Sequence, residues 1–154
     1  MNKKEQLAWA AGIIDGEGSI GIDFKRKPKE YKHPSYRLRL RVNMTHKKTV
    51  VLLKDILGVG TVRPRTMKNK KWKRQYVWSV SGNIARRVLI TLLPFLCTKR
   101  KDALLGIKFR EFMNSVVIPG RGAYPRSVIK KQHSYYLRMR KKWGNYWTAK
   151  RGKK

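Results

Sequence analysis

The sequence contains few acidic residues, one cysteine and no long apolar run. Among its 154 residues are 39 Lys and Arg, 8 Asp and Glu, and the single cysteine Cys97. One cysteine excludes an internal disulfide and a zinc site made of cysteines alone. The apolar runs are too short to span a bilayer, and the apolar stretch at 7–14 is not followed by the small-residue cleavage site of an export signal. We therefore expect an intracellular protein.

The excess of basic residues indicates a polyanionic partner. The formal net charge is +31, which attracts nucleic acid or an anionic membrane surface. Nucleic acid is favoured, because no segment pairs a basic face with a strongly apolar one, as membrane-surface helices do. Half of the acidic residues lie in the first 23 positions: Glu5, Asp15, Glu17 and Asp23. A polyanion binder with its carboxylates gathered in one short segment is expected to use them.

Hydrophobic periodicity predicts one α+β domain. Helices are expected at 4–15, between Thr45 and Gly58, and at 83–93, 98–114 and 127–147, and strands at 19–25, 36–44, 59–65 and 72–81. The order α-β-β-α-β-β-α-α, followed by the last helical segment, favours one antiparallel sheet with helices on one face. We expect residues 1–115 to form the core, and residues 116–154 to add a basic loop, helix and tail to the same domain.

The predicted strands alternate apolar residues with basic or polar ones. Same-face residues on a strand stand about 6.7 Å apart, and duplex DNA rises about 3.4 Å per base pair, so alternate residues would meet every second base pair. Arg pairs well with guanine, and Asn and Gln with adenine. The alternative is a merely solvated face, but such a face normally mixes charges and this one has a single acid. The predicted DNA-binding set is Asp23, Lys25, Arg37, Arg39, Arg41, Asn43, Thr61, Arg63, Arg65, Lys73 and Gln75.

Asp15 and Glu17, flanked by glycines, lie where the first helix is expected to end. Carboxylates at a helix C-terminus are unfavourably placed, so a compensating cation such as Mg²⁺ is one reading. The alternative, that Asp15 caps a nearby element and Glu17 is solvated, is equally open. Ala8, Gly12 and Gly16 recur every four residues with Ala11 beside them. This spacing allows close approach of another backbone, from this chain or from a second copy.

Residues 8–20, AWAAGIIDGEGSI, resemble the signature of the LAGLIDADG homing endonucleases. The identities are Ala11, Gly12, Ile14, Asp15 and Gly18, and Glu17 replaces the second Asp. Further similar stretches lie at 41–49, 58–65 and 92–105, so the resemblance covers about residues 1–115. It implies an α-β-β-α-β-β-α fold with a saddle-shaped sheet, and a homodimer that makes a staggered break with 3′ overhangs in a long, near-palindromic DNA target.

The resemblance also implies roles for particular residues. Glu17 and the carbonyl of Gly16 would bind Mg²⁺, with Mn²⁺ as a substitute and Ca²⁺ binding without cleavage. Lys99 would polarise the scissile region through water. His46 is a further catalytic candidate, at a position where relatives commonly have Gln. The two signature helices of the dimer would pack along a seam made of Ala8, Ala11, Gly12 and Asp15.

Two alternatives to the endonuclease stay open. One is an RNA-binding maturase that acts on intron RNA with the same fold, because charge does not distinguish DNA from RNA. The other is a noncatalytic DNA-binding regulator, which the presence of Glu17, Gly16 and Lys99 disfavours. In each case Lys141 and Lys142, in the basic C-terminal segment, are expected to contact phosphates. The host compartment, whether organelle, bacterium, archaeon or phage-infected cell, is not indicated.

Overall fold

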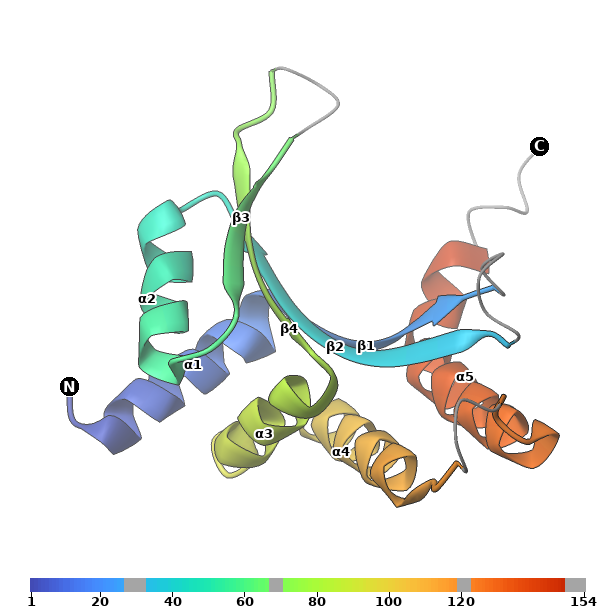
Figure 1. The fold of residues 1–154 in the computed structure, drawn as a ribbon. Helices are drawn as coiled ribbons and strands as arrows, with labels where there is room; N and C mark the ends of the chain where they lie inside the picture. Colours follow the sequence, from blue (N-terminus) through green and yellow to red (C-terminus); the bar gives the residue numbers. More distant parts are fainter. Residues whose placement is uncertain (27–32, 67–70, 119–122, 149–154) are drawn as a thin grey trace.

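The computed structural model describes residues 1–26, 33–66, 71–118 and 123–148, with side chains described as far as Lys141. The elements follow the expected order (Figure 1), which confirms the α+β prediction. They are α1 (Lys3–Glu17), β1 (Gly18–Lys25), β2 (Ser35–Met44), α2 (Lys47–Leu57), β3 (Thr61–Arg65), β4 (Gln75–Ser81), α3 (Gly82–Leu92), α4 (Arg100–Ser115) and α5 (Arg126–Thr148).

The four strands form one antiparallel sheet in the order β1-β2-β4-β3. The sheet is strongly curved: Figure 1 shows α3 and α4 beneath it and the β3–β4 hairpin, which belongs to the same sheet, rising above them. Helix α5 lies at the far end of β1 and β2 and contacts β1, β2 and α4. We call the face of the sheet that turns away from the helices the open face.

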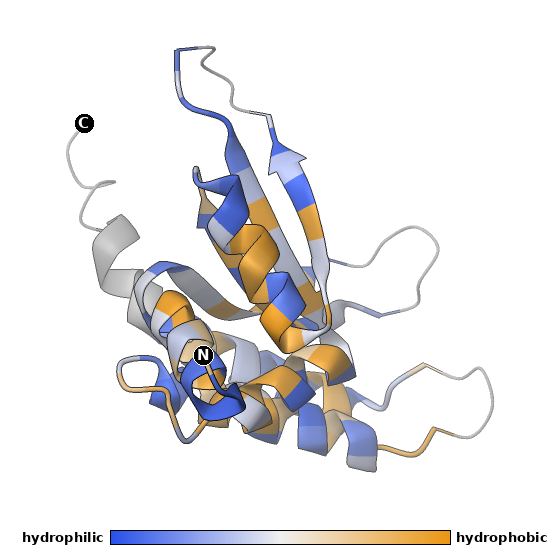
Figure 2. Ribbon diagram, turned by 90° about the vertical axis from the view of Figure 1, so that its left-hand side faces the viewer, coloured by the Kyte–Doolittle hydropathy of each residue, from blue (hydrophilic) through white to orange (hydrophobic). Residues whose placement is uncertain are grey.

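The core lies between the sheet and the helices. Leu38, Leu40 and Val42 of β2 are fully buried, as is Trp78 of β4, whereas the residues between them are not. Figure 2 shows the resulting alternation of hydrophobic and hydrophilic residues along the strands. Helix α4 packs so closely that a Cβ on Gly106 would lie 2.8 Å from Cδ1 of Leu38. The alternation predicted for these two strands is therefore confirmed.

Helix α1 continues two residues beyond its expected end. It begins with a capping box between Asn2 and Glu5 and runs through Glu17, after which the N–H of Gly18 donates to the carbonyl of Ile14. A Cβ on Gly18 would lie 2.5 Å from that oxygen, so only glycine allows this direct turn into β1. Glu17 thus lies in the last helical turn, immediately before the sheet.

Strand β3 begins at Thr61 rather than at the predicted residue 59. Gly60 has φ of 99°, and a Cβ there would lie 2.3 Å from Nε1 of Trp78. The same nitrogen donates to the carbonyl of Val59 at 2.9 Å. Residues 59 and 60 therefore form the turn that receives the buried indole and do not belong to the strand.

Strand β4 begins at Gln75, so the prediction of a strand from residue 72 is wrong. Gln75 pairs with Arg65, the last residue of β3, and the chain before it has no strand partner among the described residues. Trp72, the first residue of the predicted strand, is 63% exposed. Lys73 is exposed as well and lies outside the sheet, so it is not part of the open face.

The C-terminal helix α5 is anchored to the end of the sheet. Met139 is buried in the core, and the hydroxyl of Tyr36 lies 2.9 Å from Nδ1 of His133. Burial raises the pKa of Tyr36, and the neighbouring Tyr136 adds to this. None of the helices in the described part of the chain is both long and apolar enough to cross a membrane.

Candidate nucleic-acid interface and metal site

The predicted basic residues occupy adjacent rows across the open face. Because antiparallel partners point to the same side of a sheet, the strand register places each arginine beside small or polar residues of neighbouring strands. The rows are Asp23–Arg37, Gly21–Arg39–Ser81, Ser19–Arg41–Ser79–Thr61, Asn43–Val77–Arg63 and Gln75–Arg65. Lys25 lies at the exposed end of β1. Every member of the predicted DNA-binding set on the sheet, apart from Lys73, is thus brought to one surface.

The one acid of this set neutralises one arginine. Asp23 and Arg39 form an ion pair of 3.0 Å, with exposed side-chain fractions of 39% and 27%. Exposed ion pairs contribute little to stability, but this one fixes the direction of Arg39. Both residues line a hollow of about 450 Å³ on the open face, together with Arg37 and Ser81.

Arg41, at the centre of the open face, is poorly satisfied within the chain. Its Nε is buried without a hydrogen-bond partner, as is Oδ1 of Asn43. Burial lowers the pKa of Arg41, and repulsion by Arg39 and Arg65 lowers it further while Asp23 opposes the shift. A donor and an acceptor without partners among the described residues, on a face with one acid, favour an external polar and anionic ligand.

Asp15 is held by the start of α4, far along the chain. Its Oδ2 accepts from the backbone N–H of Cys97 at 2.7 Å. Its Oδ1 accepts from the N–H of Lys99 at 2.9 Å and from the Thr98 hydroxyl at 3.0 Å. Burial raises the pKa of Asp15, but these hydrogen bonds outweigh it, so the pKa is lowered overall. Asp15 therefore caps the start of α4 from α1. The alternative expected a capping role for Asp15, but at a nearby element, whereas the capped helix is distant in the sequence.

Lys99 compensates the negative end of α1. It is the N-cap residue of α4, and its ammonium group donates to the backbone carbonyl of Asp15. A cation is favourable at a helix C-terminus. The predicted catalytic lysine is thus brought to the turn that carries Gly16 and Glu17.

Glu17 and Gly16 are both exposed at this turn. In the part of the chain that the structure describes, no hydrogen bond or ion pair involves the Glu17 carboxylate. The Gly16 carbonyl lies in the last helical turn, where carbonyls have no helical N–H to accept from. Carboxylate and carbonyl oxygens suit Mg²⁺ and Ca²⁺. The described residues contain no group of three His, Cys, Asp or Glu that could hold a metal ion.

His46 is not joined to this site by any contact among the described residues. It is the exposed N-cap of α2, and its Nδ1 lies 2.7 Å from the hydroxyl of Thr49. Its assigned catalytic role stays a prediction.

The small residues of α1 divide between the core and the surface. Ala8, Gly12 and Gly16 are exposed, and a Cβ on Gly12 would meet nothing within 4 Å. Ala11 is fully buried within the chain, so its assignment to a seam with a second copy is wrong: it packs in the core of its own chain. Glycine inside a helix costs about 0.5–1 kcal/mol relative to Ala, and nothing in the described chain requires it at position 12.

The open face includes two serines that the sequence analysis did not single out, and the predicted phosphate-binding lysines lie on α5. Ser79 and Ser81 take part in the open-face rows, and the same two-residue period that identified the arginines would have found them. Lys141 is exposed on α5. The side chain of Lys142 lies outside the described residues.

No model of a protein family matches the chain, and no curated protein sequence matches it either. Solved structures do match. The homing endonuclease I-CvuI, in complex with its target in the presence of 2 mM Ca, is 24% identical, with a TM-score of 0.72 over 89% of this chain and 81% of that chain.

Two further structures show the same similarity. The archaeal intron-encoded homing endonuclease I-Vdi141I, complexed with DNA, is 14% identical, with a TM-score of 0.61 over 88% of this chain and 99% of that chain. The I-LtrWI LAGLIDADG homing endonuclease bound to target DNA is 17% identical, with a TM-score of 0.66 over 88% of this chain and 43% of that chain. Together with the element order and the sheet described above, these matches show that the chain has the fold of the LAGLIDADG homing endonucleases.

Proposed function

We propose that the chain is a site-specific DNA endonuclease that acts as a homodimer and requires divalent metal ions. The observation that carries this proposal is the position of Glu17. Its exposed carboxylate has no partner among the described residues and lies immediately before β1. Strand β1 belongs to the sheet whose open face is rich in arginine and poor in acidic residues. The fold is shared with endonucleases that were solved with DNA, which supports DNA as the ligand.

The open face is the proposed DNA-binding surface. Its curvature and its period of about 6.7 Å between same-face residues suit a groove in which alternate side chains meet every second base pair. Arg41 and Asn43 are the proposed base readers, because a buried atom of each lacks a partner in the part of the chain that the structure describes. Arg binds guanine and Asn binds adenine through paired hydrogen bonds. Lys141 and Lys142 are proposed to contact phosphates.

Glu17 and the Gly16 carbonyl are the proposed metal ligands. Bound there, a divalent ion would lower the pKa of a water molecule and stabilise the leaving oxygen. Lys99 places a positive charge at the Asp15 carbonyl, beside the position proposed for the scissile phosphate, and its other N–H donors can orient water there. Mg²⁺ is the proposed ion, Mn²⁺ a substitute, and Ca²⁺ an ion that binds without supporting cleavage.

A second copy would complete the site. One chain supplies one carboxylate, whereas cutting both strands of a duplex requires two. Ala8, Gly12 and Gly16 are exposed along α1, and glycine at position 12 is unexplained within the chain, so close packing of α1 against its symmetry mate supplies a reason for it. Two-fold symmetry of the protein implies a near-palindromic target.

A cleavage assay on a duplex library, with Mg²⁺ or with Ca²⁺, tests the proposal. Glu17→Gln should abolish cleavage in Mg²⁺ and leave DNA binding in Ca²⁺ intact, because the amide keeps the shape and loses the charge. Asp55→Asn, which removes an exposed carboxylate on α2, is the matched control and should cut normally. A Glu17→Gln protein that cuts at the unmodified rate would remove Glu17 from the metal site. DNA binding without any cleavage would favour the noncatalytic regulator, and preference for structured RNA the maturase.

A further inference from the structure

A second basic hollow lies where β4 ends. Strand β4 stops at Ser81, opposite Arg39, whereas β2 reaches back to Ser35. Along residues 35–38, β2 therefore pairs with β1 on one side and with no described strand on the other. A hollow of about 290 Å³ occupies this position. Arg37 and Ser81 line both this hollow and the hollow on the open face, so the two adjoin.

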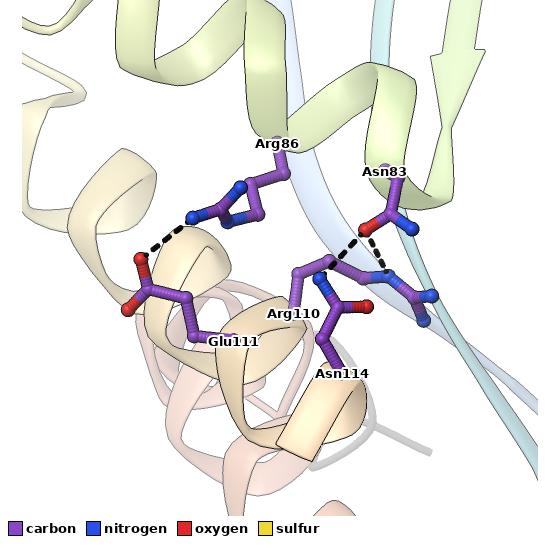
Figure 3. Close-up of polar contacts among 5 residues, drawn as sticks. All are labelled: Asn83, Arg86, Arg110, Glu111 and Asn114. Atoms are coloured by element: carbon purple, nitrogen blue, oxygen red, sulfur yellow. Dashed lines mark hydrogen bonds and ion pairs between the residues drawn. The ribbon is translucent and has the colours of Figure 1, made fainter. Parts of the chain in front are cut away.

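Arg110 of α4 lines the second hollow, and Figure 3 shows its side chain hydrogen-bonded to Asn83. Its Nε donates to Oδ1 of Asn83 at 2.9 Å, and Asn114 donates to the same oxygen at 3.0 Å. The terminal nitrogens of Arg110 have no partner among the described residues. Arg86, close by, is paired with Glu111 at 3.0 Å instead. Arg110 thus presents a fixed pair of donors, the geometry that binds phosphate best.

The surroundings of Arg110 favour an anion. Arg37 and His33 also line the hollow, and no described lining residue is acidic. Helix α3 begins at this hollow, and the Ser81 side chain does not cap it, so its first N–H groups add positive potential. Gln132, 2% exposed, lines the hollow from α5, and its Oε1 has no partner among the described residues. This oxygen is an acceptor, so it suits a water molecule at the wall of the hollow and not the phosphate itself.

We infer that the second hollow binds a phosphate group of the DNA backbone through the terminal nitrogens of Arg110, with Arg37 beside it. The inference rests on the proposed binding of DNA to the open face, which leads into this hollow. Asp23 lies opposite Arg37 in the strand register. It is five residues along β1 from Gly18, or about 17 Å away. That corresponds to about five base pairs from the Glu17 end. The phosphate therefore belongs to the flank of the target.

The salt dependence of DNA binding tests this contact. The probe is a 40-base-pair duplex of random sequence, titrated in Ca²⁺ between 50 and 200 mM salt. Each lost phosphate contact lowers the slope of log affinity against log salt by about 0.9. Over this range the unmodified protein should therefore lose about 3.5-fold more affinity than Arg110→Gln. Arg87→Gln, the matched control, removes an exposed arginine that lines a different hollow, between α3 and the first two helices, and should keep the unmodified slope.

Arg110→Lys separates a charge contact from a structural role. It keeps the positive charge and should restore the slope, with thermal unfolding verifying that each variant is folded. Equal slopes for Arg110→Gln and Arg87→Gln, or a folded Arg110→Lys that fails to restore the slope, would overturn the inference. Unmodified protein that does not bind the duplex would instead overturn the proposed function.

The source of the phosphate is distinguished with inorganic phosphate. If phosphate alone raises the unfolding temperature of the unmodified protein but not of Arg110→Gln, and the DNA slopes are equal, the hollow binds a free phosphate compound. That result would overturn the assignment to the DNA backbone. If the slopes differ as expected, the backbone assignment stands.

Discussion

The contact between Asp15 and the start of α4 allows a quantitative test of how the proposed catalytic turn is held. Asp15→Asn preserves the shape of the side chain but replaces two carboxylate oxygens with one oxygen and one NH₂ group. In the structure Oδ2 accepts from Cys97 and Oδ1 from Thr98 and Lys99. The new NH₂ group must therefore face one of the backbone N–H groups, donor against donor.

The expected cost follows from that lost hydrogen bond. A hydrogen bond to a charged group is worth about 1.5–3 kcal/mol. Because Asp15 is only half-buried, water compensates for part of the lost hydrogen bond. We expect the free energy of unfolding to fall by about 1.5–2 kcal/mol. At this chain length each kcal/mol lost from the free energy of unfolding lowers Tm by about 2–4 °C. The expected decrease in Tm is therefore about 3–8 °C. DNA cleavage should fall as well, because Asp15 joins the helices that carry Glu17 and Lys99.

The assay is urea and thermal unfolding of both proteins as a function of pH. Folding lowers the pKa of Asp15. Its contribution to the free energy of unfolding is therefore complete above the pKa of the unfolded chain, about 3.9. That contribution is lost as the pH falls through the lower pKa of the folded protein. The difference between the proteins should therefore be constant near neutral pH and shrink below about pH 4. Asp55→Asn should change stability little at any pH. An Asp15→Asn protein as stable as the unmodified one at pH 7, or a pH-independent difference, would refute the capping role.

Three further predictions concern packing, assembly and readout. Gly106→Ala should destabilise the fold by about 1–2 kcal/mol in urea unfolding, because its Cβ would lie 2.8 Å from Cδ1 of the buried Leu38; unchanged stability would show that α4 can move away. Gly12→Leu should abolish a light-scattering species of twice the 18.1 kDa chain mass, and a dimer that persists would place the seam elsewhere. Arg41→Gln should cost about 1–3 kcal/mol of binding at particular base pairs, whereas Lys141→Gln should weaken all duplexes alike; equal weakening of every duplex by Arg41→Gln would exclude base readout.

The sequence by itself determined the order of the elements and the two faces of the sheet. Side-chain direction along a strand depends only on position, since successive residues point to opposite sides. The alternation of Leu38 and Leu40 with Arg39 and Arg41 therefore predicted one buried and one basic face before any contact was known. The same period failed at Trp72, because pairing ends at Gln75 and an unpaired segment has no fixed faces.

Only the tertiary structure decided between the alternatives for the two acids at the end of α1. Their spacing left open whether both bind a cation or Asp15 is a cap, because the donors to Asp15 lie 82 and 84 residues away. Among the described residues, Glu17 has no such donor. The tertiary structure likewise buries Ala11 and leaves Gly12 exposed. Which face of α1 is buried depends on the side from which the other elements pack against it. Arg110 had no sequence signal at all: its position depends on α3 and α4 meeting where β4 ends. Local periodicity determines faces, whereas contacts between distant segments determine which side chains on them keep unused hydrogen-bonding groups.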